Sequence, residues 1–328
     1  MKKAFLTGAT GFLGSHLAER LVDEGFEVSC LVRKTSNLRW IEKLPLNLVY
    51  GDISDDLSWL ASSLSEMDYV FHVAGLVHTD SIKRYYEVNG DAAGNLAKIC
   101  AENCKNLKRF VLVSSLAAVG KGDGGNPAND LIEPKPLSEY GKSKREGEVQ
   151  VLQYSDKIPI SIIRPPAIFG PRDSDILLFF RLIENRIRPV LAGGRQKIPL
   201  LYVTNVVDGI MLAAEKDGAI GRAFLLGDGE NAEINILFSY IEQFFGRKAL
   251  PVPVPAIVLI AAGVSADIIA KAIGKSLVIS YDKVKELLNE NWAVDDSCAR
   301  EVLGYYPAVS IQEGIEKTYE WYKENKWL

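Results

Sequence analysis

Tyr140 and Lys144 lie four residues apart in SEYGKSKREGE (138–148), where no apolar stripe accounts for either side chain. On a helix, positions i and i+4 share one face, one turn apart. A free phenol titrates near pH ~10, too high for proton exchange at neutral pH, and a neighbouring ammonium lowers that pKa by stabilising the phenolate. The pair therefore predicts a proton-transfer site, and a solvated helix start is the alternative.

Two serines precede this stretch at the end of the apolar run RFVLVSS (109–115). If that run is a strand, Ser114 and Ser115 lie at its carboxyl end, where ligands bind in open α/β sheets. A hydroxyl there can hydrogen-bond a substrate carbonyl or alcohol while the phenol exchanges a proton. Ser115 is the first candidate for this role, and Ser114 is its neighbouring alternative.

The first half of the chain alternates short apolar runs with helical patterns. Most runs carry apolar residues at consecutive positions, as strands do when both faces of a sheet are covered. Repeated βα units of this kind predict an α/β fold with a Rossmann-type, doubly wound parallel sheet. The six expected strands are 2–8, 27–33, 46–52, 68–75, 109–115 and 159–165.

A glycine-rich turn, TGATGFLG (7–14), follows the first expected strand and opens a helix. Missing Cβ atoms let such a turn close and let its backbone approach a pyrophosphate, and the helix N-terminus offers unpaired N–H groups to the anion. The position predicts a dinucleotide site rather than a structural turn alone. The expected contacts are Gly8, Thr10, Gly11, Phe12, Leu13 and Gly14.

The end of the second strand, CLVRKTS, bears on which dinucleotide binds. Sites that prefer NAD place an acid there for the ribose 2′-hydroxyl. Val32 stands at that position, and Arg33 and Lys34 follow it. A guanidinium suits a 2′-phosphate through paired hydrogen bonds, so NADP(H) is favoured and NAD(H) is the alternative. The alternative interpretation is that Arg33 and Lys34 are only exposed charges of a loop.

Two further loops follow strands at the same edge of the sheet. Asp52 and Ile53 are expected beside adenine, although Asp52 could instead cap the following helix. Ala74 and Gly75 are small enough to admit a cofactor closely, with loop packing as the alternative reading.

These features together resemble the extended short-chain dehydrogenase/reductase family, which includes NAD-dependent epimerases and dehydratases. The resemblance covers essentially the whole chain and rests on TGATGFLG, GDISD, HVAG, VSSLAAVG, YGKSK, RPPAIFGPRD and YVTNVVDG. It implies that Ser115 polarises the substrate, that Tyr140 is the acid/base, and that Lys144 binds the nicotinamide ribose and tunes the tyrosine. It also implies cofactor contacts from Tyr140, Lys144, Pro165, Ala167 and Ile168.

Three departures from family patterns narrow the reaction. Dehydratases carry an Asp-Glu pair after the catalytic hydroxyl, and Leu116-Ala117 stand here. Many sugar-nucleotide epimerases have Asn where this chain has Ala167, and Arg where it has Ile198, although Arg195 and Lys197 could compensate. Epimerases also commonly keep the missing acid after the second strand.

The pattern is closest to the branch with 3β-hydroxysteroid dehydrogenases and dihydroflavonol reductases. That likeness implies a dehydrogenase/reductase acting on a secondary alcohol or ketone of a small, apolar substrate. A nucleotide-sugar epimerase is the alternative. A non-catalytic dinucleotide sensor is a third reading, but such relatives usually lose the tyrosine or lysine that this chain keeps. The resemblance further implies a homodimer through helices around 90–104 and 140–155.

Composition excludes several other classes. The net charge of −4 gives no broad electrostatic case for nucleic acid binding. Four cysteines without C-x-x-C spacing predict neither a zinc site nor a disulfide framework, and we expect no metal. MKKAFLTGATG lacks the apolar core of a signal peptide, so a cytoplasmic location is expected.

The most apolar stretch, 256–274, contains Asp267 and Lys271 and is too short to span a bilayer. It favours a buried helix or helix pair, with a pocket lid or membrane-surface contact as alternatives. We expect a dinucleotide-binding domain over 1–165 and a mainly substrate-binding lobe over 166–328, with some segments returning to the first domain. The glycine-rich loop 121–130 is expected to be either a mobile substrate lid or an irregular connection.

Overall fold

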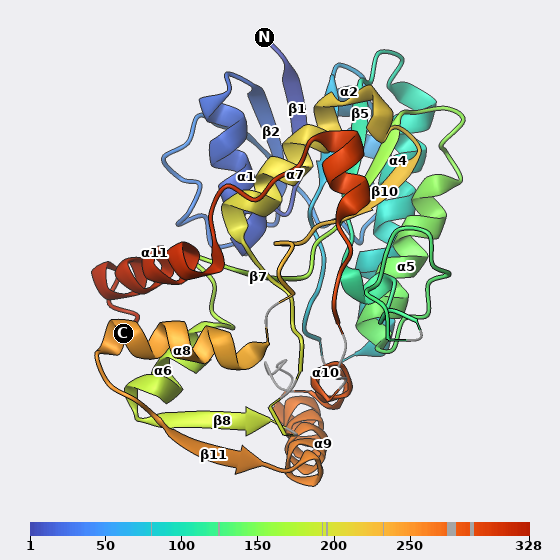
Figure 1. The fold of residues 1–328 in the computed structure, drawn as a ribbon. Coiled ribbons are helices and arrows are strands. Elements are labelled where there is room, and N and C mark those ends of the chain that lie inside the picture. Colours follow the sequence, from blue (N-terminus) through green and yellow to red (C-terminus); the bar gives the residue numbers. More distant parts are fainter. Residues whose placement is uncertain are drawn as a thin grey trace.

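The computed structural model describes residues 1–79, 81–123, 125–191, 193–194, 196–231, 233–273, 280–288 and 292–328, with backbone only for 271–273. A parallel sheet of seven strands, in the order β10-β6-β5-β4-β1-β2-β3, forms its upper half (Figure 1). Its strands are β1 Lys3–Thr7, β2 Glu27–Val32, β3 Leu46–Tyr50, β4 Tyr69–His72, β5 Arg109–Val113, β6 Ile160–Arg164 and β10 Arg222–Leu225. The Rossmann-type fold predicted from the sequence is confirmed, and all six expected strands form.

Helices cover both faces of this sheet. One face packs against α1 Phe12–Asp23 and α7 Val203–Glu215, and the other packs against α2 Ala61–Leu64, α4 Ala92–Asn103 and α5 Glu139–Leu152. Each interface is an apolar core in which residues such as Leu17 and Leu96 are fully buried. Because both faces are covered, the strands read as continuous apolar runs rather than as alternating ones.

The second half of the chain builds a smaller group of elements below the carboxyl edge of the sheet (Figure 1). Two short parallel pairs, β7 with β9 and β8 with β11, are flanked by helices, and residues 222–225 return to the main sheet as β10. The elements are β7 Ala167–Phe169, β8 Ile187–Leu191, β9 Leu200–Tyr202, β11 Leu250–Val254, α6 Leu177–Glu184, α8 Ile234–Phe245, α9 Ala256–Ile273, α10 Tyr281–Leu287 and α11 Ile311–Glu324.

Short irregular helices complete the chain. A short helix, α3 Ile82–Tyr85, leads into a π-helical segment at Tyr86–Asp91, just before α4. A second π-helical segment spans Ala299–Leu303, and 3₁₀ turns span Ser58–Leu60, Leu116–Ala118 and Asp217–Ala219.

The second lobe differs from its sequence pattern in two places. The run PLLYVTNV (199–206) has the apolar and β-branched residues of a strand, but β9 ends at Tyr202 and α7 begins at Val203. Buried residues at 203, 206, 207, 210 and 214 follow helical spacing, which outweighs the β-branched composition of the first few. Within the described part of 256–274, a single helix forms, and much of it is exposed rather than buried in the core.

Candidate functional site

The glycine turn lies between β1 and α1, where the backbone comes closest to itself. Gly8 adopts a φ of 81°, and the Gly11 N–H donates to the Gly8 carbonyl at 3.0 Å. A Cβ on Gly14 would lie 2.1 Å from that carbonyl oxygen, so only glycine fits there. Helix α1 begins at Phe12 with no side-chain cap at Gly11, which leaves its first N–H groups for an anion.

A large cavity, about 900 Å³ in volume, begins at this turn. Every residue that the sequence predicted for catalysis or cofactor binding lines this cavity, except Lys34. These are Gly8, Thr10, Gly11, Phe12, Leu13, Gly14, Arg33, Asp52, Ile53, Ala74, Gly75, Ser115, Tyr140, Lys144, Pro165, Ala167 and Ile168. The glycine turn and the helix end that a dinucleotide needs are therefore present along one wall.

At one end of the cavity, two arginines surround Asp52. Val32 is buried at the end of β2, Arg33 follows it on the cavity wall, and Lys34 is exposed outside the cavity. Burial raises the pKa of Asp52, but hydrogen bonds from Ser54 and the charges of Arg33 and Arg84 outweigh burial, and the net pKa is lowered. Asp52 therefore holds a turn with Ser54 rather than capping a helix. Lys34 does not line the cavity, so its cofactor contact stays a prediction.

The next strand end brings small residues against the candidate catalytic helix. The Ala74 N–H donates to Thr7 Oγ1 at 3.2 Å, and a Cβ on Gly75 would lie 3.0 Å from Asn89 Oδ1 and 3.4 Å from Lys144 Nζ. Ala74 and Gly75 thus line the cavity between β1 and α5 with little room for a larger side chain.

Ser115, Tyr140 and Lys144 converge at the carboxyl end of β5. Ser115 caps the 3₁₀ turn Leu116–Ala118, its Oγ accepts from the Ala117 N–H at 3.1 Å, and its hydroxyl hydrogen-bonds the Tyr140 phenol. One turn along α5, Lys144 Nζ donates to the Val113 carbonyl at 2.7 Å. Ser114 also lines the cavity, but its hydroxyl is buried beside Glu148.

The pKa values of Tyr140 and Lys144 differ from those expected from the sequence. Burial raises the pKa of Tyr140 to about 12, although the Ser115 hydrogen bond lowers it. Burial lowers the pKa of Lys144 to about 8, while Glu148 raises it. The expected lowering of the phenol pKa by Lys144 is wrong for this structure, because the ammonium is directed at a backbone carbonyl and burial dominates. At neutral pH the phenol holds its proton.

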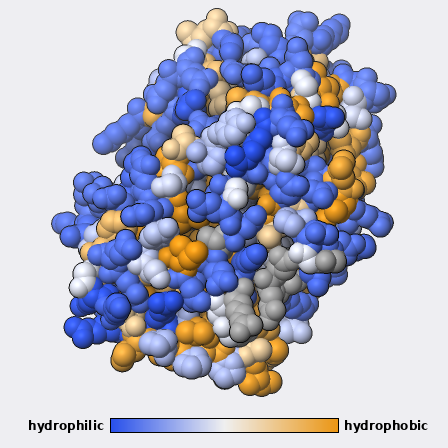
Figure 2. Space-filling model, in the orientation of Figure 1, coloured by the Kyte–Doolittle hydropathy of each residue, from blue (hydrophilic) through white to orange (hydrophobic). Residues whose placement is uncertain are grey.

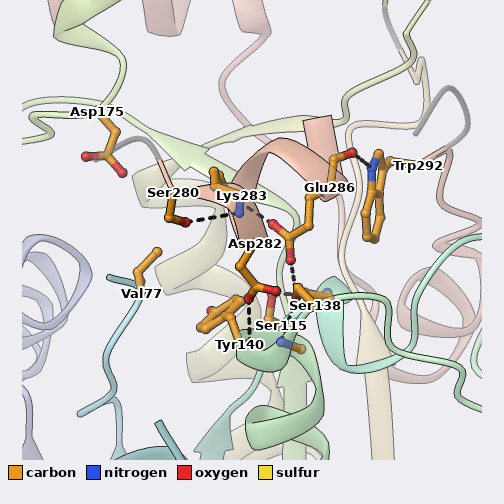
Figure 3. A network of polar contacts seen from close by, with 12 residues as sticks. Val77, Ser115, Ser138, Tyr140, Asp175, Ser280, Asp282, Lys283, Glu286 and Trp292 are labelled. Atoms are coloured by element: carbon orange, nitrogen blue, oxygen red, sulfur yellow. Dashed lines mark hydrogen bonds and ion pairs between the residues drawn. The ribbon is translucent and has the colours of Figure 1, made fainter. Parts of the chain in front are cut away.

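Helix α10 clamps the start of the helix that carries Tyr140 and Lys144 (Figure 3). The carboxylate of Asp282 accepts the N–H groups of Glu139 and Tyr140 at 3.0 and 3.1 Å. Ser138 caps α5 by accepting the Gly141 N–H at 2.9 Å, and its hydroxyl donates to Glu286 Oε1 at 2.5 Å. An acid at a helix N-terminus is favourable, so this contact fixes the first turn of α5.

Beyond the trio, the cavity wall becomes almost entirely apolar. Its apolar side chains come from α6, β8, α8, β11 and α9, and include Leu178, Leu182, Ile187, Leu191, Leu237, Val252 and Leu259. The polar groups on this side are few. They are His78 and Asp175, whose Nε2 and Oδ2 lie 3.1 Å apart, Asp173, whose pKa burial raises to about 7, and Lys283 and Glu286 of α10.

The loop 121–130 does not form a lid over the cavity. The described part of this loop is tied to the body of the protein: Ala128 is buried and bridges to Val294, and Asp130 accepts the Leu225 N–H at 2.8 Å. None of its described residues lines the cavity. Of the two expectations, the irregular connection fits and the lid does not, because backbone pairing with residues 293–295 and the Asp130 carboxylate at Leu225 hold the loop in place.

Several residues near the site carried no recognisable signal in the sequence. Asn89, in the π-helical segment, accepts the Leu76 N–H at 2.8 Å and donates to Ser143 Oγ at 3.0 Å, which joins the loop after β4 to α5. Arg84 lines the cavity and, like Arg33, lowers the pKa of Asp52, and α10 supplies Asp282 and Glu286 from far along the chain. The motif around Asn89, EVNGD, could have indicated only a helix start.

Membrane and metal features are absent from the described ranges. No helix in them is long and apolar enough to cross a membrane, and no three His, Cys, Asp or Glu side chains there gather as metal ligands.

Comparison with known proteins decides the family. The model of the NAD-dependent epimerase/dehydratase family matches residues 4–227, well over half of the chain. The chain belongs to this family. It is an enzyme of the extended short-chain dehydrogenase/reductase type, whose members similar to it include dehydrogenases, reductases and epimerases.

Its relatives in the family have different reactions. The chain is 29% identical over 332 residues to a ceramide reductase of Caulobacter vibrioides, covering 98% of this chain and 95% of that protein. It is 27% identical over 330 residues to a UDP-glucose 4-epimerase of Vibrio cholerae, covering 97% and 94%. Its fold matches that of a UDP-glucuronic acid 4-epimerase from Bacillus cereus in complex with NAD, at a TM-score of 0.78, 23% identity and coverage of 98% and 99%.

Proposed function

We propose that this protein is an NAD(P)-dependent oxidoreductase that moves a hydride between nicotinamide and a secondary alcohol or ketone of a small, apolar substrate. The observation that carries the proposal is the apolar wall that begins at Ser115 and Tyr140 and continues into the second lobe. Side chains such as Leu182 and Leu237 bind alkyl or ring carbons by excluding water from them. The few polar groups orient the reacting oxygen.

The same wall argues against a nucleotide-linked sugar. A diphosphate is bound in proteins by arginines, lysines or helix N-termini. Among the described lining residues of the substrate side, Lys283 is the single lysine or arginine, and Ala167 and Ile198 stand where epimerases carry Asn and Arg. Arg195, which could compensate, lies outside the described residues, and Lys197 is exposed beside Glu233.

Each member of the trio has a defined task in this proposal. Ser115 donates a hydrogen bond to the substrate oxygen, and Tyr140 supplies a proton to that oxygen when a ketone becomes an alcohol. A phenol whose pKa is about 12 is protonated at neutral pH, which suits it to act as an acid in the direction of reduction. Lys144, held against Val113, would bind the cofactor ribose. A bound nicotinamide supplies the hydride.

NADP(H) is the proposed cofactor, and Arg33 is the residue that tests this. Arg33 and Arg84 lie around Asp52 on the cavity wall, where a 2′-phosphate would meet two guanidinium groups. Arg33→Ala should raise KM for NADPH by about 10- to 100-fold, since charge-assisted hydrogen bonds contribute about 1.5–3 kcal/mol, and leave KM for NADH nearly unchanged. Lys34→Ala is the matched control. An NADH preference in the unmodified protein would contradict the assignment.

The epimerase alternative rests on family membership and on relatives such as the Vibrio cholerae enzyme. The reductase proposal is supported by others: besides the ceramide reductase, a sterol-4-alpha-carboxylate 3-dehydrogenase of Dictyostelium discoideum is 25% identical over 329 residues. The two candidates differ in cofactor use, because a reductase consumes NADPH with its substrate and an epimerase regenerates its cofactor in each cycle.

A substrate screen tests the proposal directly. The full chain is mixed with NADPH or NADH and an apolar ketone, or with oxidised cofactor and an apolar alcohol. UDP-sugars are tested in the same way, and the absorbance of the reduced cofactor is followed. We expect net cofactor turnover with at least one apolar ketone or alcohol. Preferential binding of a UDP-sugar without net cofactor turnover would favour the epimerase over the reductase. A homodimer and a cytoplasmic location stay predictions, the former open to sedimentation analysis.

A further inference from the structure

One end of the molecule exposes apolar side chains rather than burying them. The exposed fractions of Leu250 and Ile257 are both 71%, and that of Ile268 is 65%, values ordinary for charged surface residues. Figure 2 shows hydrophobic residues gathered at this end, over β8, β11 and α9. We define the apolar pole as Ile187, Leu250, Val252, Ile257, Val258, Val264, Ile268 and Ile269.

Helix α9 packs inward through Leu259, Gly263 and Ala270 and leaves several branched side chains exposed. A Cβ on Gly263 would lie 2.9 Å from the Cα of Tyr281, and Ala270 is buried, so α9 lies close against α10 on this side. Asp267, the single charged residue among its described side chains, accepts the Tyr281 N–H at 3.2 Å. The branched residues Ile257, Val258, Val264, Ile268 and Ile269 remain exposed on the surface of α9.

The apolar pole is continuous with the wall of the cavity. Ile187 and Val252 line the cavity and are also about 40% exposed, and Leu178 of α6 shares both properties. Leu259 of α9 lines the cavity as well. The cavity therefore reaches the surface at this pole, and its mouth is apolar.

Basic side chains border the apolar pole. Arg247 and Lys248 are exposed in the turn that leads into β11, and Arg186 joins them because its carbonyl accepts the Leu250 N–H at 2.9 Å. On α10, Lys285 is exposed and its Nζ lies 3.9 Å from Asp282 Oδ1, while Asp282 and Glu286 also accept hydrogen bonds from the start of α5. A basic border around an apolar surface complements anionic lipid head groups.

We propose that the apolar pole docks on the surface of a bilayer that contains anionic lipids, and that a membrane-dissolved substrate enters the cavity there. The entry of a membrane-dissolved substrate rests on the proposed function, whereas the docking on the bilayer does not. The branched residues of α9 enter the acyl boundary, Arg247, Lys248 and Lys285 contact head groups, and the mouth at Ile187 and Val252 opens toward lipid.

Vesicle flotation of the full chain tests the docking. Vesicles of phosphatidylcholine alone are compared with vesicles that also contain phosphatidylglycerol. We expect the protein to float with the anionic vesicles, and Ile257→Glu with Ile268→Glu to lower the partition coefficient by about 10-fold or more. Arg247→Gln with Lys248→Gln should lower it by about 5-fold per charge, on anionic vesicles only.

Leu131→Glu is the matched control for the acidic substitutions, because Leu131 is 95% exposed and lies outside the apolar pole. The proposal is overturned if the protein floats with neither vesicle, or if the double isoleucine variant floats as well as the unmodified protein. It is also overturned if that variant abolishes a self-association seen in sedimentation while no vesicle binding occurs, since a second copy would then cover the pole.

Activity measurements separate the two proposals. A short, water-soluble ketone and a long-chain ketone carried in anionic vesicles are compared as substrates. The double isoleucine variant should retain activity on the first and lose about 10-fold or more on the second. Ketone reduction without vesicle binding would contradict only the docking proposal. Vesicle binding without any ketone reduction would contradict only the proposed function.

Discussion

Tyr140→Phe is expected to lower kcat for ketone reduction by about 10²–10⁴-fold, the contribution typical of a positioned general acid. The substitution removes one oxygen from the cavity and leaves the ring packed against Tyr85, whose centroid lies 6.0 Å away. Since Lys144 and the glycine turn are unchanged, NADPH binding should stay within about 2-fold, which fluorescence or calorimetric titration would show.

Tyr85→Phe is the matched control for this experiment. Tyr85 is buried next to Tyr140, but its hydroxyl donates to the Val77 carbonyl and it does not line the main cavity. We expect its loss to cost some stability through the lost hydrogen bond and to leave kcat within a few-fold of the unmodified enzyme. If Tyr140→Phe kept full activity, the assignment of the acid/base would be wrong.

Glu148→Gln is expected to lower the free energy of unfolding by about 3–5 kcal/mol, the usual cost of removing one partner of a buried ion pair. Glu148 is fully buried on α5, one helical turn after Lys144. Its two oxygens accept from Arg164 Nε and Nη2, both at 2.8 Å, and one also accepts from Arg145 Nη1 at 2.8 Å. The substitution leaves the Arg164 guanidinium buried beside a neutral amide, which urea unfolding would detect.

The pH dependence of this effect follows from the pKa of Glu148. Burial raises that pKa, but the hydrogen bonds and charge of Arg164 more than offset it, so the folded-state pKa is lowered. A carboxyl with a lowered pKa stabilises the fold above its unfolded pKa, about 4.3, and this contribution is lost as pH falls through the folded value. The difference between the unmodified protein and Glu148→Gln should therefore be full at pH 7 and shrink in acid.

Glu146→Gln is the control for Glu148→Gln on the same helix. Glu146 is only partly buried and accepts a single hydrogen bond, from Gln150 Nε2 at 3.0 Å, so its replacement should cost less than about 1 kcal/mol. Equal stability losses for the two variants would mean that the Arg164 pair does not hold α5 in place.

The parts of the site that could be predicted from the sequence are local. The spacing of Gly8, Gly11 and Gly14 fixes a turn by steric necessity, and the i, i+4 spacing of Tyr140 and Lys144 fixes their shared helix face. Ser115 joins them because it ends a strand next to their helix. In each case a short segment determines its own geometry, and the strand order of the Rossmann-type sheet brings these segments together.

The parts that could not be predicted depend on distant partners or on the balance of burial and charge. Asp282 and Glu286 reach α5 from more than 130 residues away, and no local pattern marks them. The apolar composition of α9 predicted burial, but whether a helix is covered depends on what packs on it. For Tyr140, proximity to Lys144 was visible in the sequence, whereas the dominating burial was not.

Transfer of deuterium from labelled cofactor tests the central claim most directly. The enzyme is given NADPH carrying deuterium at the transferable position of nicotinamide C4, together with the apolar ketone that supports turnover, and the product is analysed by mass spectrometry. We predict one deuterium on the carbinol carbon of the alcohol for each oxidised cofactor released, and a loss of both in Tyr140→Phe. Interconversion of a UDP-sugar with no net release of oxidised cofactor, and no labelled alcohol from any ketone, would contradict the account.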